Sequence, residues 1–265
     1  NDGCVVARSQ QVKDLGIKMG VPLFQVQQLV NQHQIQLFSS NYTLYADMSA
    51  RVMSLLEEFT PRMEVYSIDE AFLDLTGVYP CYQDPIAYGQ RIRKAIARQT
   101  GIPVCVGMGP TKTLAKLANF AAKKWKQTGG VLDLTDPIRR QNLMKIVPVD
   151  EVWGIGRQTT KRLNQLGIQT VWDLAIQSPK TIQAQFNVVV ARTVMELNGT
   201  ACLDLEDVAA DKQQIVCSRS FSRKLTELDE LSRALSEYCT RAAEKLRRQQ
   251  SVTGCVSVFI RTNPF

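Results

Sequence analysis

The sequence predicts an α+β fold built from several consecutive parts, and three observations support this prediction. Apolar residues at 43–59 recur at spacings of three and four, which is the pattern of a helix with one buried face. Short apolar runs that are typical of strands lie between helical segments, at 65–68, 71–75, 102–108 and 131–134. The region 148–199 is helical in pattern almost throughout. A chain of 265 residues is also long enough for two or three domains.

The elements at 65–134 follow the order strand, strand, helix, strand, helix, strand. Asp84 and Pro85 predict the N-cap and first turn of the first of these helices, and Gly109-Pro110-Thr111 precedes the second. This order fits a ferredoxin-like α+β sheet whose opening strand is missing. The chain begins with Asn1 and ends on an apolar run, so we expect both ends to be truncated.

The two ends of the chain predict smaller parts. Residues 1–41 form an irregular lobe, with a strand-like run at 4–7 and a short helix at 8–15 that Gly16 ends. An acidic stretch at 200–212 is interpreted as a linker. The remainder predicts one half of an α/β unit, with a strand at 214–220, a helix at 228–248 and a strand at 253–262.

Composition excludes several classes of protein. The chain is 45% hydrophobic and 22% charged, which indicates a globular protein, and it has neither a long apolar run nor a secretory signal. The seven cysteines are scattered and form no Cys-x-x-Cys pair, which is typical of free thiols in a reducing cytosol and argues against zinc. His33 is the only histidine, and we interpret it as a surface residue.

The net charge of +7 is unevenly distributed along the chain. Residues 85–132 carry nine Lys or Arg and no acid, whereas 40–84 carry eight acids and two bases. In the basic segment Lys112, Lys116 and Lys123 lie within about 40° of one direction on a helix. With no acid nearby in the sequence to pair them, they predict an anion site, although a solvated helix face is the alternative.

Asp69 and Glu70 interrupt the apolar run at 65–77. In one regular strand these neighbours would point to opposite faces, and one carboxylate would be buried without a partner. A hairpin with both residues at its tip avoids this conflict. Two carboxylates at one tip suit a Mg²⁺ ion that is also bound by substrate phosphates. An ordinary surface turn with two solvated acids is the alternative.

A second motif is the Val-Trp-Gly-Ile-Gly run at 152–156, which an amphipathic segment at 161–168 follows. The pattern predicts a helix-hairpin-helix, in which glycines let the backbone approach a DNA phosphate and free helix amides bind it. Candidate DNA-binding residues are Gly154, Ile155, Gly156 and Lys161, and a plain helical turn is the alternative. Such binding would be independent of DNA sequence.

The run Ser-Ile-Asp-Glu-Ala-Phe-Leu-Asp at 67–74 resembles the palm signature of Y-family translesion DNA polymerases. Asn41-Tyr42-x-Leu44-Tyr45-Ala46-Asp47-Met48-Ser49 is similar to the UmuC branch of that family. The resemblance covers essentially the whole chain. It implies fingers at 1–41, a palm at 42–137, a thumb with the helix-hairpin-helix at 138–199, and the first half of a little finger at 213–265.

The resemblance also implies a function. The full-length protein would be an error-prone DNA polymerase that acts in SOS-dependent DNA repair, with two Mg²⁺ ions held partly by Asp69 and Glu70. Lys13, Arg8 and Lys123 would bind the nucleoside triphosphate. Expected partners are primer-template DNA, a deoxynucleoside triphosphate, cleaved UmuD, the RecA filament and the sliding clamp, in the bacterial cytoplasm and at the nucleoid when active.

One departure from the family pattern supports a different reading. The family's first metal carboxylate lies in an Asp-x-Asn-x-Phe-Tyr context on an opening strand, and this stretch does not occur in the printed sequence. The nearest N-terminal acids, Asp2 and Asp14, are not in that context and take no role. We therefore expect this chain alone to be impaired in catalysis. A non-catalytic DNA-binding protein that uses the helix-hairpin-helix and the basic face is the alternative.

Overall fold

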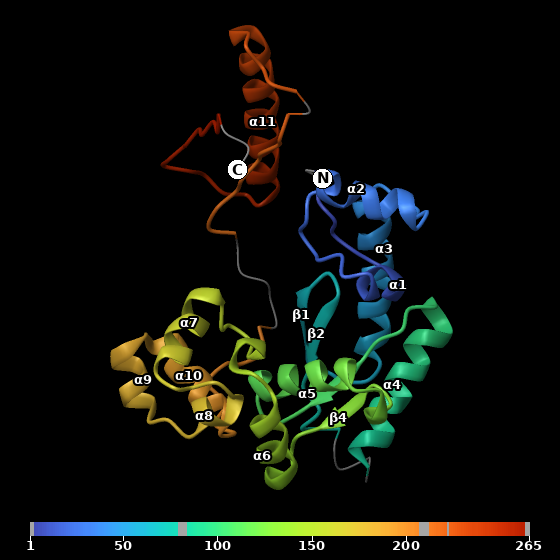
Figure 1. The fold of residues 1–265 in the computed structure, drawn as a ribbon, viewed down its shortest axis with the longest axis vertical. Coiled ribbons are helices and arrows are strands. Elements are labelled where there is room, and N and C mark those ends of the chain that lie inside the picture. The colour runs from blue at the N-terminus through green and yellow to red at the C-terminus, as the bar shows by residue number, and fades with distance from the viewer. Residues whose placement is uncertain (1–2, 79–83, 207–211, 222, 263–265) are drawn as a thin grey trace. The chain divides into compact units, whose positions relative to one another are not determined.

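The computed structural model describes residues 3–78, 84–206, 212–221 and 223–262 (Figure 1). The chain divides into two compact units, one formed by Asn1–Ser40 with Ala209–Phe265 and the other by Asn41–Val208. In the described ranges, no helix has the length and apolar character needed to cross a membrane. The six described cysteines are free, as expected, and Cys81 lies outside the described residues.

The unit Asn41–Val208 contains all the described strands and most of the helices. In chain order its elements are α3 (Tyr42–Glu57), β1 (Met63–Ser67), β2 (Glu70–Leu73), α4 (Pro85–Thr100), β3 (Val106–Met108), α5 (Lys112–Lys124), η2 (Lys126–Thr128), β4 (Val131–Asp133), α6 (Pro137–Ile146), η3 (Val149–Glu151), α7 (Arg157–Gln165), α8 (Val171–Ala175), α9 (Pro179–Gln185) and α10 (Val188–Leu197). The predicted order of strands and helices from β1 to β4 is confirmed, and so is the helical character of 148–199.

The strands form two separate ladders instead of the single ferredoxin-like sheet that the element order predicted. Strands β1 and β2 pair antiparallel, and β3 and β4 pair parallel across helix α5. Joining the two pairs into one sheet would need a further strand between them. The described residues of the chain supply no such strand.

Helices α3 and α4 pack through a small core. The Asp84 carboxylate accepts the amide of Ile86 at 2.9 Å with Pro85 in the first turn, so the predicted N-cap is confirmed. Tyr88 is buried and its hydroxyl donates to the carbonyl of Phe59. Only the second half of α3 is covered in this way. Tyr45, in the first half of α3, is 43% exposed, so the buried face predicted over 43–59 does not extend to this residue.

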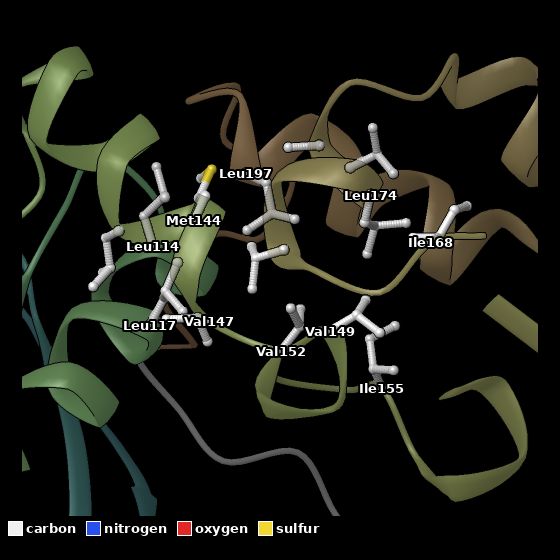
Figure 2. Packing of buried hydrophobic residues seen from close by; sticks show 14 of the residues in the cluster. Leu114, Leu117, Met144, Val147, Val149, Val152, Ile155, Ile168, Leu174 and Leu197 are labelled. Carbon is white, nitrogen blue, oxygen red and sulfur yellow. The ribbon is translucent and has the colours of Figure 1, made fainter. Parts of the chain in front are cut away.

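Helix α5 lies at the centre of the unit. A Cβ atom at Gly107 in β3 would stand 2.0 Å from the amide nitrogen of Asn119 and 2.4 Å from the carbonyl oxygen of Ala115, so the helix and the strand touch through backbone atoms. The other side of α5 faces the largest core. Figure 2 shows Leu114 and Leu117 together with apolar side chains from the following helices, including Met144 and Leu197. One core therefore joins segments assigned above to palm and thumb, and the domain boundaries stay predictions.

A buried carboxylate fixes the start of α5. Glu196 on α10 is fully buried, and its carboxylate accepts the amide of Thr113 at 3.0 Å. The same carboxylate accepts the amides of Cys202 at 2.7 Å and Leu203 at 3.2 Å. Acidic groups are stabilising at helix N-termini because they bind free amides and oppose the positive end of the dipole. Residues 202 and 203, in the segment interpreted as a linker, are thus held to the unit.

The other unit contains α1 (Gln10–Asp14), α2 (Leu23–Gln32) and α11 (Leu228–Arg248). The helix at 228–248 is confirmed, and the spacing of Leu23, Val26 and Val30 is a signal that could have predicted α2. His33 is exposed at the end of α2, as expected.

The strand predictions for this unit are wrong. The run at 4–7 makes only an isolated bridge, from Cys4 to Pro22. The described residues of 214–220 and 253–262 form no strand. A strand requires a partner for its backbone groups, and these two segments do not pair with each other.

We predict that Glu196→Ala lowers the free energy of unfolding of the unit by about 3 kcal/mol or more, because three amides lose a charged acceptor. All three tryptophans, Trp125, Trp153 and Trp172, lie in this unit, so tryptophan fluorescence during urea unfolding measures it. Glu196→Gln keeps the shape and should lose less. The control Glu57→Ala, at an exposed helix position, should change stability by less than about 0.5 kcal/mol. Equal effects of Glu196→Ala and Glu57→Ala would contradict the assignment.

Candidate functional site

The hairpin predicted from the carboxylate pair is present. In the β1–β2 ladder Ser67 pairs with Glu70, so Ile68 and Asp69 form the turn and Glu70 is the first residue of β2. Asp69 is exposed, and its carboxylate accepts the Ser67 hydroxyl at 2.8 Å. The two acids therefore lie at the tip, where no unpaired carboxylate has to be buried.

Strand alternation gives the hairpin two different faces. The register places Phe72 directly opposite Glu64, and Tyr66, at a register shift between Val65 and Ser67, contacts the Phe72 ring with centroids 5.6 Å apart. The side chains of this face contact helix α5. On the other face Val65 is 54% exposed, although it stands in the middle of the ladder. The hairpin thus turns Glu64, Tyr66 and Phe72 towards α5.

Two ion pairs join this face to α5. The Lys116 ammonium lies 2.5 Å from a Glu70 carboxylate oxygen, with side-chain exposures of 19% and 37%. Lys112 pairs with Glu64, and both side chains are only 10% exposed. Glu64 also accepts the backbone amide of Glu206 at 2.8 Å. The lysine pairs therefore link the hairpin, helix α5 and the segment that follows α10.

These pairs correct the interpretation of the lysine row. The expectation that no acid pairs the lysines is wrong for Lys112 and Lys116, because their partners are 48 and 46 residues earlier in the sequence. Only the folded hairpin brings the acids to them. Lys123, in the last turn of α5, is exposed and makes no side-chain ion pair or hydrogen bond with any described residue. Lys123 alone of the three stays available for an anion.

The other two triphosphate candidates lie in the unit Asn1–Ser40 with Ala209–Phe265. Arg8 is half-buried and donates from Nη1 to the carbonyl of Ile17 at 2.7 Å, so its guanidinium already supports the local fold. Its buried Nε has no partner among the described residues. Lys13 is exposed in the last turn of α1. The roles of Arg8 and Lys13 stay predictions.

The Gly154 loop, which we define as residues 152–156, has two buried side chains that anchor it in the core and two exposed glycines, Gly154 and Gly156. Val152 and Ile155 are buried in the large core, at 4% and 7% exposure, so Ile155 offers only backbone atoms to a ligand (Figure 2). Gly154 has a φ of +86°, which favours glycine. Gly156 is the N-cap residue of α7 and supplies no side-chain cap, and Lys161 is exposed in the helix that follows. The Ile155 amide donates to the carbonyl of Val152 at 3.0 Å, so the loop can present the amides of Gly154 and Gly156, together with Lys161, to an anion.

An aromatic cluster lies between the hairpin and the Gly154 loop. The indole N–H of Trp153 donates to the Tyr66 hydroxyl at 3.1 Å, and Phe72 lies 5.7 Å from the indole ring centroid. The Lys112 and Lys116 ammonium groups lie over the rings of Phe72 and Tyr66, at 5.1 and 5.3 Å from the centroids. Trp153 was not predicted as a functional residue. Its position directly before Gly154 was the sequence signal that could have identified it.

Metal binding by the hairpin rests on two carboxylates. Among the described residues no group of three or more His, Cys, Asp or Glu could hold a metal ion. Two carboxylates nevertheless suffice for a Mg²⁺ ion that takes its other ligands from water and substrate phosphates. Asp69 and Glu70 therefore fit one such ion, although Glu70 is bound to Lys116 in this structure.

We predict that Lys112→Met lowers the free energy of unfolding by about 3 kcal/mol, because the Glu64 carboxylate stays buried without its cation. Lys116→Met should cost about 1 kcal/mol or less, because water can reach its partner Glu70. Both substitutions keep an apolar stem over the neighbouring ring. Urea unfolding followed by tryptophan fluorescence provides the comparison, and equal losses for the two variants would contradict the difference in burial.

Comparison with known proteins gives consistent matches. A sequence model described as the impB/mucB/samB family matches residues 1–119, and a model of the C-terminal domain of that family matches 212–265. Protein UmuC of Salmonella typhimurium is 51% identical over 266 residues, and protein MucB of Escherichia coli is 47% identical over 265. Each alignment covers all of this chain and 63% of the relative, so the chain spans less than two thirds of these relatives.

Two solved structures are similar in fold to this chain. An insertion ternary complex of Dbh DNA polymerase has a TM-score of 0.64 and 26% identity, covering 75% of this chain and 56% of that one. DinB from Sulfolobus solfataricus has a TM-score of 0.61 and 28% identity, covering 74% and 56%. About three quarters of this chain therefore shares its fold, which contains both helices and strands, with these solved structures.

Proposed function

Because this chain belongs to the impB/mucB/samB family, we propose that it forms part of an error-prone translesion DNA polymerase that acts in the SOS response. The full-length gene product would add a deoxynucleotide to a primer 3′-hydroxyl opposite damaged template. One observation carries the proposal. A hairpin places Asp69 in an exposed turn and Glu70 at the start of the next strand, beside a basic helix.

We assign the parts of the chain to the parts of such a polymerase. Residues 42–137, with β1–β4 and α3–α5, would be the palm, and 138–199 the thumb, with the Gly154 loop as its helix-hairpin-helix. Residues 1–41 would belong to the fingers and 213–265 to the little finger. The shared fold with two solved DNA polymerases supports this division.

Asp69 and Glu70 would hold Mg²⁺ at the hairpin tip. When bound, the ion neutralises charge on the phosphates and helps to align the primer hydroxyl. A second ion is expected in the full-length protein. Lys116 would be displaced from Glu70 or would share it, because one carboxylate oxygen is bound to the lysine in this structure.

The remaining site residues would bind phosphate. Lys123 is exposed and without an acidic partner among the described residues, which suits a triphosphate. Arg8 and Lys13 would add to it from the fingers. The amides of Gly154 and Gly156 would contact duplex phosphate with Lys161 nearby, independently of base sequence, whereas Ile155 would do so only if its amide left the carbonyl of Val152. The proposed partners cleaved UmuD, the RecA filament and the sliding clamp, and the bacterial cytoplasm as location, rest on the family alone.

We predict that Asp69→Asn in the full-length gene product slows single-nucleotide extension with Mg²⁺ by about a hundredfold or more, because one charged metal ligand is lost. Affinity for primer-template should change less than about twofold, since phosphate contacts elsewhere supply most of it. Fluorescence anisotropy measures the binding and rapid quench measures the extension.

The matched control for this experiment is Asp47→Asn, which alters an exposed acid paired with Arg51 on α3. It should leave both readouts unchanged. Parallel loss of binding and extension in Asp69→Asn would refute the metal role. A wild-type protein that binds DNA and never extends a primer would establish the alternative, a non-catalytic DNA-binding protein.

We predict that Gly156→Val weakens binding to every duplex by about tenfold, because the side chain holds the phosphate away from the loop amides. Gly156 has a φ of −88° and open space around an added Cβ, so valine fits the fold. Gly154→Val is less informative, since its positive φ also strains the backbone. The control Gly77→Val, at another open glycine, should bind normally. Normal binding by Gly156→Val would leave the plain helical turn as the reading of this motif.

A further inference from the structure

Trp153 connects two parts of the chain that have separate proposed roles. It directly precedes Gly154, and its indole N–H donates to the hydroxyl of Tyr66 on β1 at 3.1 Å. The two rings meet edge to face, with centroids 5.5 Å apart and planes at 84°. Within the described ranges, the hydrogen bond and the ring contacts between the hairpin and the Gly154 loop all use this side chain.

The contact is not needed to anchor the loop in the core. Val152 and Ile155, on either side of Trp153, are both buried among the apolar side chains of the thumb helices. Trp153 itself is half-buried, and Tyr66 stays 44% exposed. A side chain that only filled the core would point into it. This indole points to the hairpin, and its only hydrogen-bond donor, the ring N–H, bonds there.

The connection continues to the hairpin tip. The Lys116 ammonium lies 5.3 Å from the centroid of the same Tyr66 ring and 2.5 Å from the Glu70 carboxylate. Tyr66 therefore contacts the indole through its hydroxyl and the lysine through its ring face. Movement of the loop would shift Tyr66, and Lys116 would follow. A continuous set of contacts thus runs from Gly154 to Glu70.

We propose that Trp153 and Tyr66 are positioning residues that fix the Gly154 loop against the hairpin, so that binding of duplex phosphate at the loop sets the position of Glu70. The inference rests on the proposed function, since it assigns duplex phosphate to one end and catalysis to the other. Neither residue touches the reacting atoms. They act on the position of the Glu70 carboxylate, at the other end of the set of contacts that begins at Gly154.

The test is a double-mutant cycle on the full-length gene product. Trp153→Phe removes the donor and keeps a ring, and Tyr66→Phe removes only the acceptor. Each single variant should slow single-nucleotide extension about fivefold, the effect expected of one hydrogen bond. The Kd for primer-template and the KM for the nucleotide should change less than twofold. The double variant should be no slower than either single variant, because both remove the same bond.

A second readout does not depend on polymerisation. Hydrogen exchange at the amides of 67–70 should slow when duplex DNA binds to the wild type, and this slowing should be lost in both single variants. Trp172→Phe makes the same chemical change at another half-buried tryptophan of the unit and should behave as wild type.

The outcomes separate the two proposals. Slowed exchange that depends on Trp153 and Tyr66, in a protein without extension activity, would support the link and refute the polymerase. Extension with additive effects in the double variant, or with exchange unchanged in both single variants, would overturn the link and leave the polymerase standing. A loss of stability in urea with unchanged extension and exchange would also overturn it, since a purely structural contact would behave in that way.

Discussion

Helix α5 lies directly against strand β3, and this approach requires glycine at position 107. Any side chain there would meet the backbone of Asn119 and Ala115, which cannot move aside as a flexible side chain could. The approach fixes the rotation of α5 about its axis. Leu114 and Leu117 then face the helices of 138–199, while Lys112 and Lys116 face the hairpin. One side of α5 therefore packs in the core, and another side contacts the candidate site.

Features that depend on neighbouring residues were predictable from the sequence. The Asp84 cap, the hairpin turn at Asp69 and the helix at 228–248 each follow from a few adjacent residues, and each is present. Features that depend on distant partners were not. The acids that pair Lys112 and Lys116 are far away in sequence. The apolar segments 214–220 and 253–262 have strand composition, but a strand exists only where another strand satisfies its backbone.

The segment 200–212 makes contacts that its composition did not indicate, and its role as a linker stays a prediction. Its acids and few long apolar residues are typical of a solvated connection. In the fold, backbone amides of Cys202, Leu203 and Glu206 donate to the buried carboxylates of Glu196 and Glu64. The binding groups belong to the main chain and carry no sequence signal. A buried acid such as Glu196 is the remaining indication of these contacts, because a carboxylate inside a core must have hydrogen-bond donors around it.

The charged side chains of this chain differ in their response to salt, and the buried ion pair of Glu64 and Lys112 illustrates one of the two cases. Its side chains are only 10% exposed, so dissolved ions screen their attraction little. Lys123 and Lys161 are exposed, and their attraction for a polyanion falls steeply as salt is added. Moderate ionic strength can therefore strip a bound polyanion from the surface while the interior electrostatics persist. The contacts that shape the chain and those proposed to hold a polyanion would therefore respond differently to added salt.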